Sequence, residues 1–323
     1  MPAPHSTASL SDVTATTTAE DALTIAVCIP SKNRPSDVLR CLASIERQTQ
    51  LPNEIILVDQ SGSAYGLPKV EGLVHIYDPS LSGASAAKNA GARASTSAVI
   101  LFLDDDVELL PACIETLREC LRHNPDAVGV GCSVINNSTG LGLWKVHAWL
   151  FGRGFFNSEA RTQGGMTELR RLGSCAAAVR RDVLLREQFD ENLVAYSYGE
   201  DWELSYRLLR YGRLLLSRES QFVHHASPQN RYAIPQLQRD RWDNFLYFFD
   251  KLDASRQPLN RAWRLWWMFG ESLMWLRNRM GLPVFGMQAR NTPKRSLSLR
   301  KQTAVQQRAT HTVKVNAGPP QVP

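Results

Sequence analysis

The sequence predicts an α/β fold with a mostly parallel sheet flanked by helices. Strand-like and helix-like segments alternate repeatedly between residues 23 and 135, which is typical of a sheet with helices on both faces. The chain has 323 residues, and 43% of them are hydrophobic, enough for a substantial core without disulfide bonds. In sheets of this kind, ligands bind beyond the carboxyl ends of the strands.

Apolar runs mark the expected strands, and apolar residues at helical spacing mark the expected helices. The first strand, LTIAVCIP, ends at Pro30, and Pro35 lies near the start of the first helix. The expected elements of the first half are strands at 23–30, 53–59, 73–78, 98–103 and 126–135, and helices at 35–49, 82–95 and 111–124.

The second half of the chain is less regular. Residues 136–171 mix aromatic residues with Gly, Asn and Arg, which is typical of a long loop or a lid over a site. A strand and a helix are expected within 173–188, a helix after Gly199, and a last strand within 213–228.

Three carboxylates, Asp104, Asp105 and Asp106, directly follow the apolar run AVILFL. Adjacent negative charges repel one another, so this position at the carboxyl end of a buried strand predicts a bound cation. The alternative is that the acids cap a helix that begins at Pro111. Asp59 ends another strand, and both strand ends should face one crevice.

The net charge of +6 is unevenly distributed. Residues 272–323 hold nine Lys and Arg and no Asp or Glu, which leaves a net charge of −3 for residues 1–271. Nucleic-acid binding by the folded part therefore has little support. The basic tail could contact anionic lipid or another acidic surface, or it could be a solvated disordered segment.

Six cysteines occur without a C-x-x-C pair, and several fall inside apolar runs. We expect reduced, mostly buried thiols of a cytoplasmic protein. Residues 1–22 contain no Lys or Arg and no apolar core, so we expect a disordered lead and not a secretory signal. No segment approaches the ~20 apolar residues that cross a bilayer, which favours a soluble or peripheral protein.

The ordered set of motifs resembles the family 2 glycosyltransferases, which have the GT-A fold and invert the anomeric centre. The resemblance covers roughly residues 23–249, and its motifs are, in order, VCIPSKNRP, LVDQSGS, SGASAAKNAG, FLDDD, GSCAAAVRR, GEDWELSYRL and FVHHASP. It implies a nucleotide-binding half at about 23–135 and an acceptor half at about 136–250.

The resemblance also assigns roles in binding the nucleotide-sugar donor. Pro30 and Arg34 would border the nucleotide, and Asp59 would accept a hydrogen bond from the base. Lys88 stands where the family usually has a basic residue near the nucleotide, with a solvated helix face as its alternative. Asp105 belongs to the same group of donor-binding residues.

The metal site implied by the resemblance is the D-x-D motif. Asp106 would bind Mg²⁺ or Mn²⁺ directly, Asp104 would lie nearer the ribose and the metal, and His224 or His225 would contact metal or phosphate. A divalent cation neutralises the charge that develops on a diphosphate leaving group. As ordinary residues at a strand end, the two histidines would have no such role.

The GED motif places the catalytic base at Asp201. The acceptor hydroxyl must lose a proton as it attacks, so a carboxylate is needed within reach. Glu200 and Glu203 compete for this role, and all three acids could simply favour the helix dipole. The acceptor would be a hydroxyl of a glycan or a lipid-linked glycan.

Two features of the C-terminal third have alternative interpretations. QRDRW, residues 238–242, matches a pattern of processive polysaccharide synthases, but we interpret it as a chance match or an acceptor helix. Residues 251–290 predict a helical extension rich in Trp and Arg, which suits either an anionic membrane surface through 261–301 or packing on the domain. Residues 291–323 are expected to be disordered.

The sequence together with this resemblance therefore predicts a metal-dependent inverting glycosyltransferase that is cytoplasmic, either free or peripheral at the inner face of a plasma membrane. One alternative is a catalytically silent sugar-nucleotide-binding scaffold, which the D-x-D and GED motifs argue against. The other is a nucleotidyltransferase, which would need a Gly-rich basic first loop, and PSKNRPSDV contains no glycine.

Overall fold

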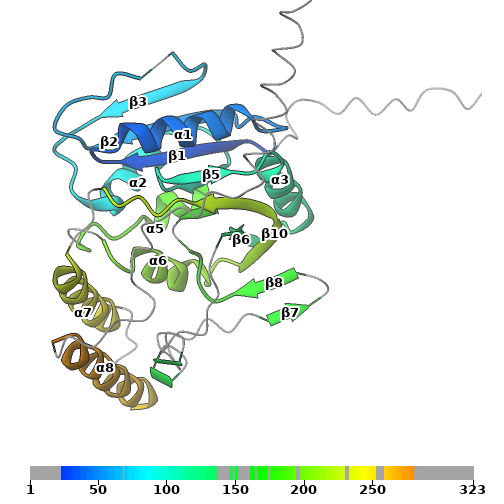
Figure 1. Cartoon of the computed structure of the whole chain (residues 1–323). Helices are drawn as coiled ribbons and strands as arrows, with labels where there is room; N and C mark the ends of the chain where they lie inside the picture. Colours follow the sequence, from blue (N-terminus) through cyan, green and yellow to red (C-terminus); the bar gives the residue numbers. More distant parts are fainter. Residues whose placement is uncertain are drawn as a thin grey trace, which may run out of the picture. The chain divides into compact units, whose positions relative to one another are not determined.

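The structure is a computed structural model (Figure 1), and it describes selected parts of the chain between residues 23 and 279. Those parts are 23–67, 69–136, 146–147, 150–151, 161–163, 166–173, 175–193, 197–229, 233–251 and 258–279. The expected disordered lead (1–22) and tail (291–323) lie outside them. The chain divides into two compact units, Met1–Pro283 and Val284–Pro323, and every described residue belongs to the first.

The described strands form one sheet of ten strands. Its order is β3-β2-β1-β4-β9-β6-β10-β8-β7, and β5 pairs with β10 off this path. The strands are β1 (Ile25–Ser31), β2 (Glu54–Asp59), β3 (Leu73–Tyr77), β4 (Val99–Leu103), β5 (Val107–Leu109), β6 (Ala127–Val134), β7 (Arg161–Gln163), β8 (Met166–Leu169), β9 (Ala176–Arg180) and β10 (Arg213–His224).

The α/β class is confirmed, but the sheet is mixed and not mostly parallel. Strands β3, β2, β1 and β4 run parallel, and so do β6 and β10. Strand β9 lies between β4 and β6 and is antiparallel to both. The expected loop at 136–171 is also corrected in part, because β7 and β8 form an antiparallel pair that extends the sheet beside β10.

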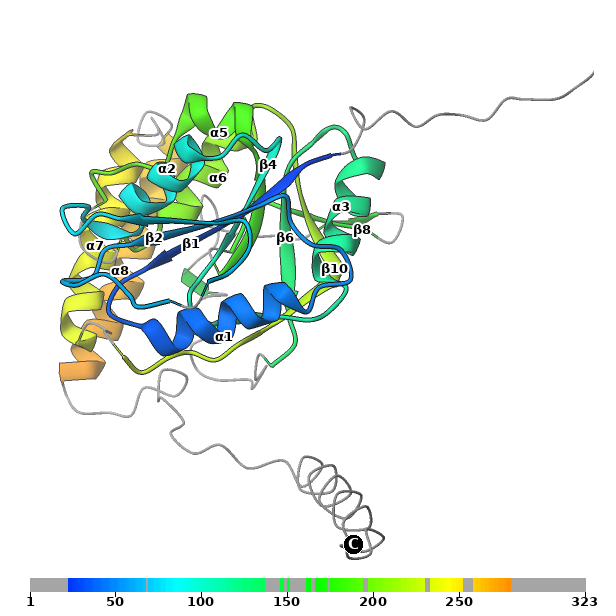
Figure 2. The same cartoon turned by 90° about the horizontal axis from the view of Figure 1, so that it is seen from above.

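Helices cover both faces of the sheet (Figure 2). Alternation along β1 shows why: Ile25, Val27 and Ile29 pack with α1 and α3, whereas Ala26 and Cys28 pack with α2, α5 and α6. The described helices are α1 (Pro35–Glu46), α2 (Gly83–Ala94), α3 (Cys113–His123), α5 (Arg181–Glu187), α6 (Glu200–Leu208), α7 (Ile234–Lys251) and α8 (Pro258–Arg279).

Helix α2 lies very close to β1 because its sequence is rich in Gly and Ala. A Cβ placed on Gly91 would lie 2.2 Å from Cys28 Sγ and 3.4 Å from a methyl group of Val58. The helix carries Lys88 and Asn89 on its buried side. Small residues therefore bring these two polar side chains close to the sheet.

Helices α7 and α8 form a small aromatic core of their own. Phe245 and Phe249 of α7 are fully buried, and Trp267 of α8 packs against Phe245 with ring centroids 5.1 Å apart. The opposite side of α8 exposes Leu265 and Phe269 to 66% and 52%. Among the helices that the structure describes, none has the length and apolar character to span a bilayer.

All six cysteines are free, as predicted, and five are buried. Cys175 differs from the others because it is only partly buried.

Candidate active site

The three adjacent aspartates lie in a tight turn between β4 and β5. The amide of Asp104 donates to the carbonyl of Cys175 at 3.0 Å, and the amide of Val107 donates to the carbonyl of Asp104 at 3.1 Å. Helix α3 begins only at Cys113, and Ala112 is its N-cap residue. The alternative that these acids cap that helix is therefore wrong.

Strand pairing brings a histidine to this turn. The antiparallel register of β5 and β10 places His224 opposite Val107. His224 Nε2 lies 3.2 Å from Asp106 Oδ1, and the amide of Ser227 donates to Asp106 Oδ2 at 2.8 Å. Although burial raises the pKa of Asp106, the bonds from His224 and Ser227 lower it to about 2, so this carboxylate is charged at neutral pH.

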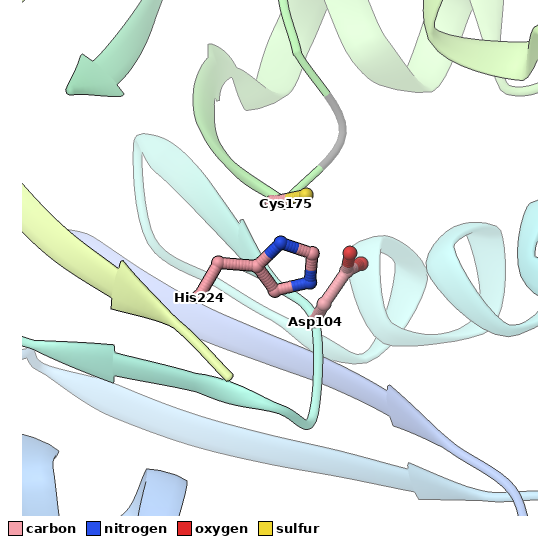
Figure 3. A group of neighbouring side chains, drawn as sticks. All are labelled: Asp104, Cys175 and His224. Carbon is pink, nitrogen blue, oxygen red and sulfur yellow. The ribbon is translucent and has the colours of Figure 1, made fainter. Parts of the chain in front are cut away.

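Three potential metal ligands, Asp104, Cys175 and His224, converge in Figure 3. One ligand atom each from Asp104, Cys175 and His224 lies within 4.8 Å of the other two. Burial raises the pKa of Asp104, and the nearby Lys88 lowers it. The structure thus brings the predicted metal residues Asp104, Asp106 and His224 close together. Carboxylate oxygens with an imidazole nitrogen form a donor set that fits a divalent cation.

His225 does not join this group. Its Nε2 lies 2.9 Å from Glu108 Oε2, and Glu108 also accepts a hydrogen bond from Arg47 Nη2 at 3.1 Å. Adjacent residues on a strand point to opposite faces, so only one of the two histidines can face the aspartates. Of the two histidines, His224 is the one whose ring lies beside the aspartates.

Asp105 accepts hydrogen bonds from other side chains of the protein. Ser31 Oγ donates to Asp105 Oδ2 at 2.7 Å, and Arg34 Nη1 donates to Asp105 Oδ1 at 3.0 Å. Burial raises the pKa of Asp105 to about 6, against the lowering effect of Arg34. Arg34 also donates through Nε to the carbonyl of Gln229 at 3.0 Å. Asp105 thus fixes the loop after β1 to the loop after β10.

Asp59 is fully buried and organises its own loop. Its Oδ1 accepts from the amide of Ser61 at 2.9 Å, and its Oδ2 accepts from the amide of Tyr65 at 3.1 Å. Pro30 does not end the first strand, since β1 continues to Ser31. Contact of Asp59 or Pro30 with a nucleotide remains a prediction.

Lys88 forms a buried ion pair with Glu200, which lies 112 residues later. Lys88 Nζ is 2.7 Å from Glu200 Oε1, and both side chains are less than a tenth exposed. The alternative of a solvated Lys88 is therefore wrong. The negative charges of Glu200, Asp104 and Asp201 all stabilise the protonated amine of Lys88. Lys88 therefore interacts both with the aspartate turn and with the first turn of α6.

The N-terminus of α6 presents Asp201. Gly199 precedes it with φ +91°, a conformation that favours glycine. Asp201 Oδ1 accepts a hydrogen bond from the amide of Trp202 at 3.0 Å, and the guanidinium carbon of Arg171 lies 3.7 Å from the ring centre of Trp202. Burial and the neighbouring charge of Glu200 raise the pKa of Asp201 to about 7.

The competing acids of α6 are already occupied. Glu200 pairs with Lys88, and Glu203 is fully buried, with Arg207 donating to both of its carboxylate oxygens. Of the three acids in the first turn, Asp201 alone has no ion pair among the described contacts. A raised pKa and freedom from a salt bridge are the properties expected of a general base.

Sequence reasoning missed Cys175 and Arg171 as members of this site, and it considered Glu200 only as a competing base and not as the partner of Lys88. Cys175 precedes β9, a strand whose direction the sequence does not indicate. Since β9 is antiparallel, its first residue Ala176 pairs with Leu103 at the end of β4. Cys175 therefore lies at the edge where the aspartates lie.

Comparison with known proteins agrees with this arrangement. A model of glycosyl transferase family 2 matches residues 26–186. Residues 26–186 form a domain of this family. This segment holds the aspartate turn, Lys88 and Cys175, whereas Asp201 and His224 lie beyond it.

Two curated glycosyltransferases are similar to part of the chain. An uncharacterized glycosyltransferase of Haemophilus influenzae is 30% identical over 109 residues, which cover 32% of this chain and 36% of that protein. A glucosyl-dolichyl phosphate glucuronosyltransferase of Haloferax volcanii is 30% identical over 121 residues, 35% of this chain and 38% of that protein. The chain thus spans little more than a third of either relative.

A solved structure shares the fold over most of the chain. A mannosyltransferase from Pyrobaculum calidifontis, in complex with GDP-Man and Mn²⁺, matches with a TM-score of 0.50 and 18% identity. The match covers 80% of this chain and 72% of that one. The chain therefore has the GT-A fold.

Proposed function

We propose that the protein is a metal-dependent inverting glycosyltransferase. It transfers a sugar from a nucleotide donor to a hydroxyl of a glycan or a lipid-linked acceptor. The observation that carries this proposal is the Asp104, Asp106 and His224 cluster, which Lys88 links to Asp201 at the N-terminus of α6. The structural neighbour with GDP-Man and Mn²⁺ supports a nucleotide-sugar donor and a divalent metal.

Asp104, Asp106 and His224 would hold Mg²⁺ or Mn²⁺. When bound, the cation supplies Lewis-acid neutralisation of the charge that develops on the departing diphosphate. Arg34, Asp105 and Asp59 would fix the loops around the nucleotide, and their hydrogen bonds support this role. The charge of Lys88 acts on Asp104 and on Asp201, and Glu200 holds Lys88 in place through their ion pair.

Asp201 would accept the proton of the attacking hydroxyl. Its raised pKa of about 7 gives a base strong enough to take that proton and still ionised in part at neutral pH. Inversion in a single displacement needs no covalent nucleophile, and this role requires only one carboxylate on the acceptor side.

Turnover of donor tests the division of roles. UDP-, GDP- and dTDP-sugars are supplied with Mn²⁺ or Mg²⁺, and nucleotide diphosphate release is measured for the wild type and Asp201→Asn. Loss of the base should lower turnover by about 10² to 10⁴, with the donor still bound. Asp182→Asn is the matched control, because Asp182 is 63% exposed and pairs only loosely with Arg186, at 3.5 Å.

Three results would overturn the proposal in different ways. If Asp201→Asn turns over as fast as the wild type, another group is the base. If the wild type binds a donor but releases no product with any acceptor, the scaffold alternative is favoured. Release of pyrophosphate from a nucleoside triphosphate would favour a nucleotidyltransferase.

We also propose that the exposed side of α8 rests on an anionic membrane surface at the cytoplasmic face. Leu265, Phe269, Leu273 and Leu276 are 43–66% exposed. At 100° per residue these four side chains fall within about 80° of one another. They form one apolar stripe opposite the buried Trp267.

Arginines border this stripe. By the same spacing, Arg261 and Arg279 fall on one side of it and Arg277 on the other. From residue 272 onward the chain carries nine Lys and Arg and no acid. An apolar stripe bordered by cations is the pattern of a helix that lies in the interface of an anionic bilayer. The dolichyl phosphate in the name of the Haloferax relative supports a lipid-linked acceptor.

Co-sedimentation with vesicles tests the membrane contact. The wild type should pellet with vesicles of phosphatidylglycerol and not with phosphatidylcholine at low salt. Leu265→Glu with Phe269→Glu should weaken binding by at least about tenfold, since each buried apolar side chain contributes about 1.5 to 3 kcal/mol. Leu51→Glu, at an apolar position 60% exposed elsewhere, should leave binding unchanged. Equal pelleting of both variants would contradict the proposal.

A further inference from the structure

Cys175 differs from the other five cysteines in its surroundings. Those five are buried among apolar residues in the two faces of the core, where a thiol serves as a small apolar side chain. Cys175 is partly exposed, and its thiol donates a hydrogen bond to the carboxylate of Asp104. Cys175 thus packs against one face of the core and also contacts the aspartate turn.

The backbone holds Cys175 firmly beside the aspartate turn. Its carbonyl accepts the amide of Asp104 at 3.0 Å, and the next residue, Ala176, pairs with Leu103 at the end of β4. Its Sγ, a carboxylate oxygen of Asp104 and a ring nitrogen of His224 lie within 4.8 Å of one another (Figure 3). One ion at the centre of this group could contact all three atoms.

The three atoms do not suit all divalent cations equally. Mg²⁺ demands octahedral oxygen ligands, whereas Zn²⁺ and Co²⁺ accept mixed oxygen, nitrogen and sulfur ligands in tetrahedral sites. Asp106 lies beside this group, with its Oδ1 3.2 Å from His224 Nε2, and is the nearest source of a second carboxylate in the aspartate turn. The described residues thus offer two carboxylates, one imidazole and one thiol.

We infer that Cys175 is a direct ligand of the metal in this site, so that the site takes borderline cations such as Co²⁺ and Zn²⁺ through a metal–sulfur bond. This inference rests on the proposed function, because the same site would hold the metal of the transfer reaction. On binding, the thiol releases its proton to the solvent and the sulfur donates an electron pair to the cation. No oxidant or reductant is involved.

The test is spectroscopic and needs no turnover. The full-length protein, purified without metal and kept reduced with a phosphine, is titrated with Co²⁺ in the absence of donor. The wild type should develop a thiolate-to-cobalt charge-transfer band in the near ultraviolet together with visible ligand-field bands. Cys175→Ser should lose the near-ultraviolet band. It should also bind Co²⁺ at least about tenfold more weakly, because even the loss of a residue that only supports a metal ligand typically lowers metal affinity by about 10- to 100-fold.

Cys120→Ser is the matched control and should keep the band, because Cys120 lies on α3 in the core, outside this group. Far-ultraviolet circular dichroism shows that each variant is folded. If Co²⁺ binds with ligand-field bands but without the sulfur band, or if Cys175→Ser keeps the band, the inference is wrong and the proposed function is unaffected. If Co²⁺ does not bind at all, both the inference and the metal-dependent function are overturned.

Discussion

Replacing Asp201 with Asn should stabilise the protein more at alkaline than at acid pH. Burial and Glu200 raise the pKa of Asp201 from 3.8 to about 7 in the folded state. The unfolded chain therefore loses this proton near pH 4, whereas the folded protein keeps it until about pH 7. As the pH rises between these values, the folded state loses stability relative to the unfolded state, and Asn removes that loss.

The size of the effect follows from that interval. Each pH unit between the two pKa values is worth about 1.4 kcal/mol, so the full penalty is about 4 kcal/mol above pH 7. Between pH 5 and pH 8, the advantage of Asp201→Asn over the wild type should grow by about 2 to 3 kcal/mol. This growth is a difference within one pair of proteins, so the other effects of the substitution largely cancel.

Urea unfolding at pH 5, 6, 7 and 8 measures this difference. Circular dichroism follows the transition, and EDTA is present so that a cation does not contribute. Asp182→Asn at an exposed site should show a constant difference from the wild type across this range. A constant difference for Asp201→Asn as well would refute the raised pKa, and a difference that shrinks with pH would mean that the pKa is lowered.

Two further substitutions test how the site is held. Lys88→Met should destabilise the protein by about 3 to 5 kcal/mol, because it leaves Glu200 charged and buried, and adding Glu200→Gln should recover part of that loss in the same urea assay. Gly91→Ala should lower the free energy of unfolding by about 1 to 3 kcal/mol through its clash with Cys28 Sγ, despite the better helix propensity of Ala. Cys28→Ala should relieve the clash, and no relief would show that the close packing of α2 is not the cause.

The first half of the fold could be predicted because its signals are local. Strands β1, β2 and β4 are centred on apolar runs, and α1 begins where Pro35 suggests. The aspartates were found for the same reason, since they directly follow a buried strand. Sequence-adjacent features of this kind need no knowledge of which strand pairs with which.

The direction of β9 could not be predicted, because pairing depends on the whole sheet. The run AAAV is equally apolar in either direction, so nothing local shows that β9 is antiparallel to both neighbours. A β9 parallel to β4 would carry Cys175 to the opposite edge of the sheet from Asp104, away from the aspartate turn.

Long-range partners also decided the roles of Lys88 and the two histidines. Lys88 is buried only because Glu200, distant in sequence, supplies the opposite charge. His224 faces the aspartates because β5, a strand of three residues, pairs with β10 in one register. Such a short strand gives no clear pattern in the sequence, so the sequence alone does not indicate which of His224 and His225 faces the aspartates.

The most direct test of the central claim is calorimetric binding of nucleotide-sugars in Mn²⁺ and in EDTA. The wild type should bind at least one UDP-, GDP- or dTDP-sugar with Mn²⁺ and lose that binding in EDTA. Asp106→Ala should abolish the metal-dependent binding, and Asp201→Asn should retain it. If no nucleotide-sugar binds under either condition, or if binding is the same in EDTA and in Asp106→Ala, the assignment of this site as a metal-dependent donor site is contradicted.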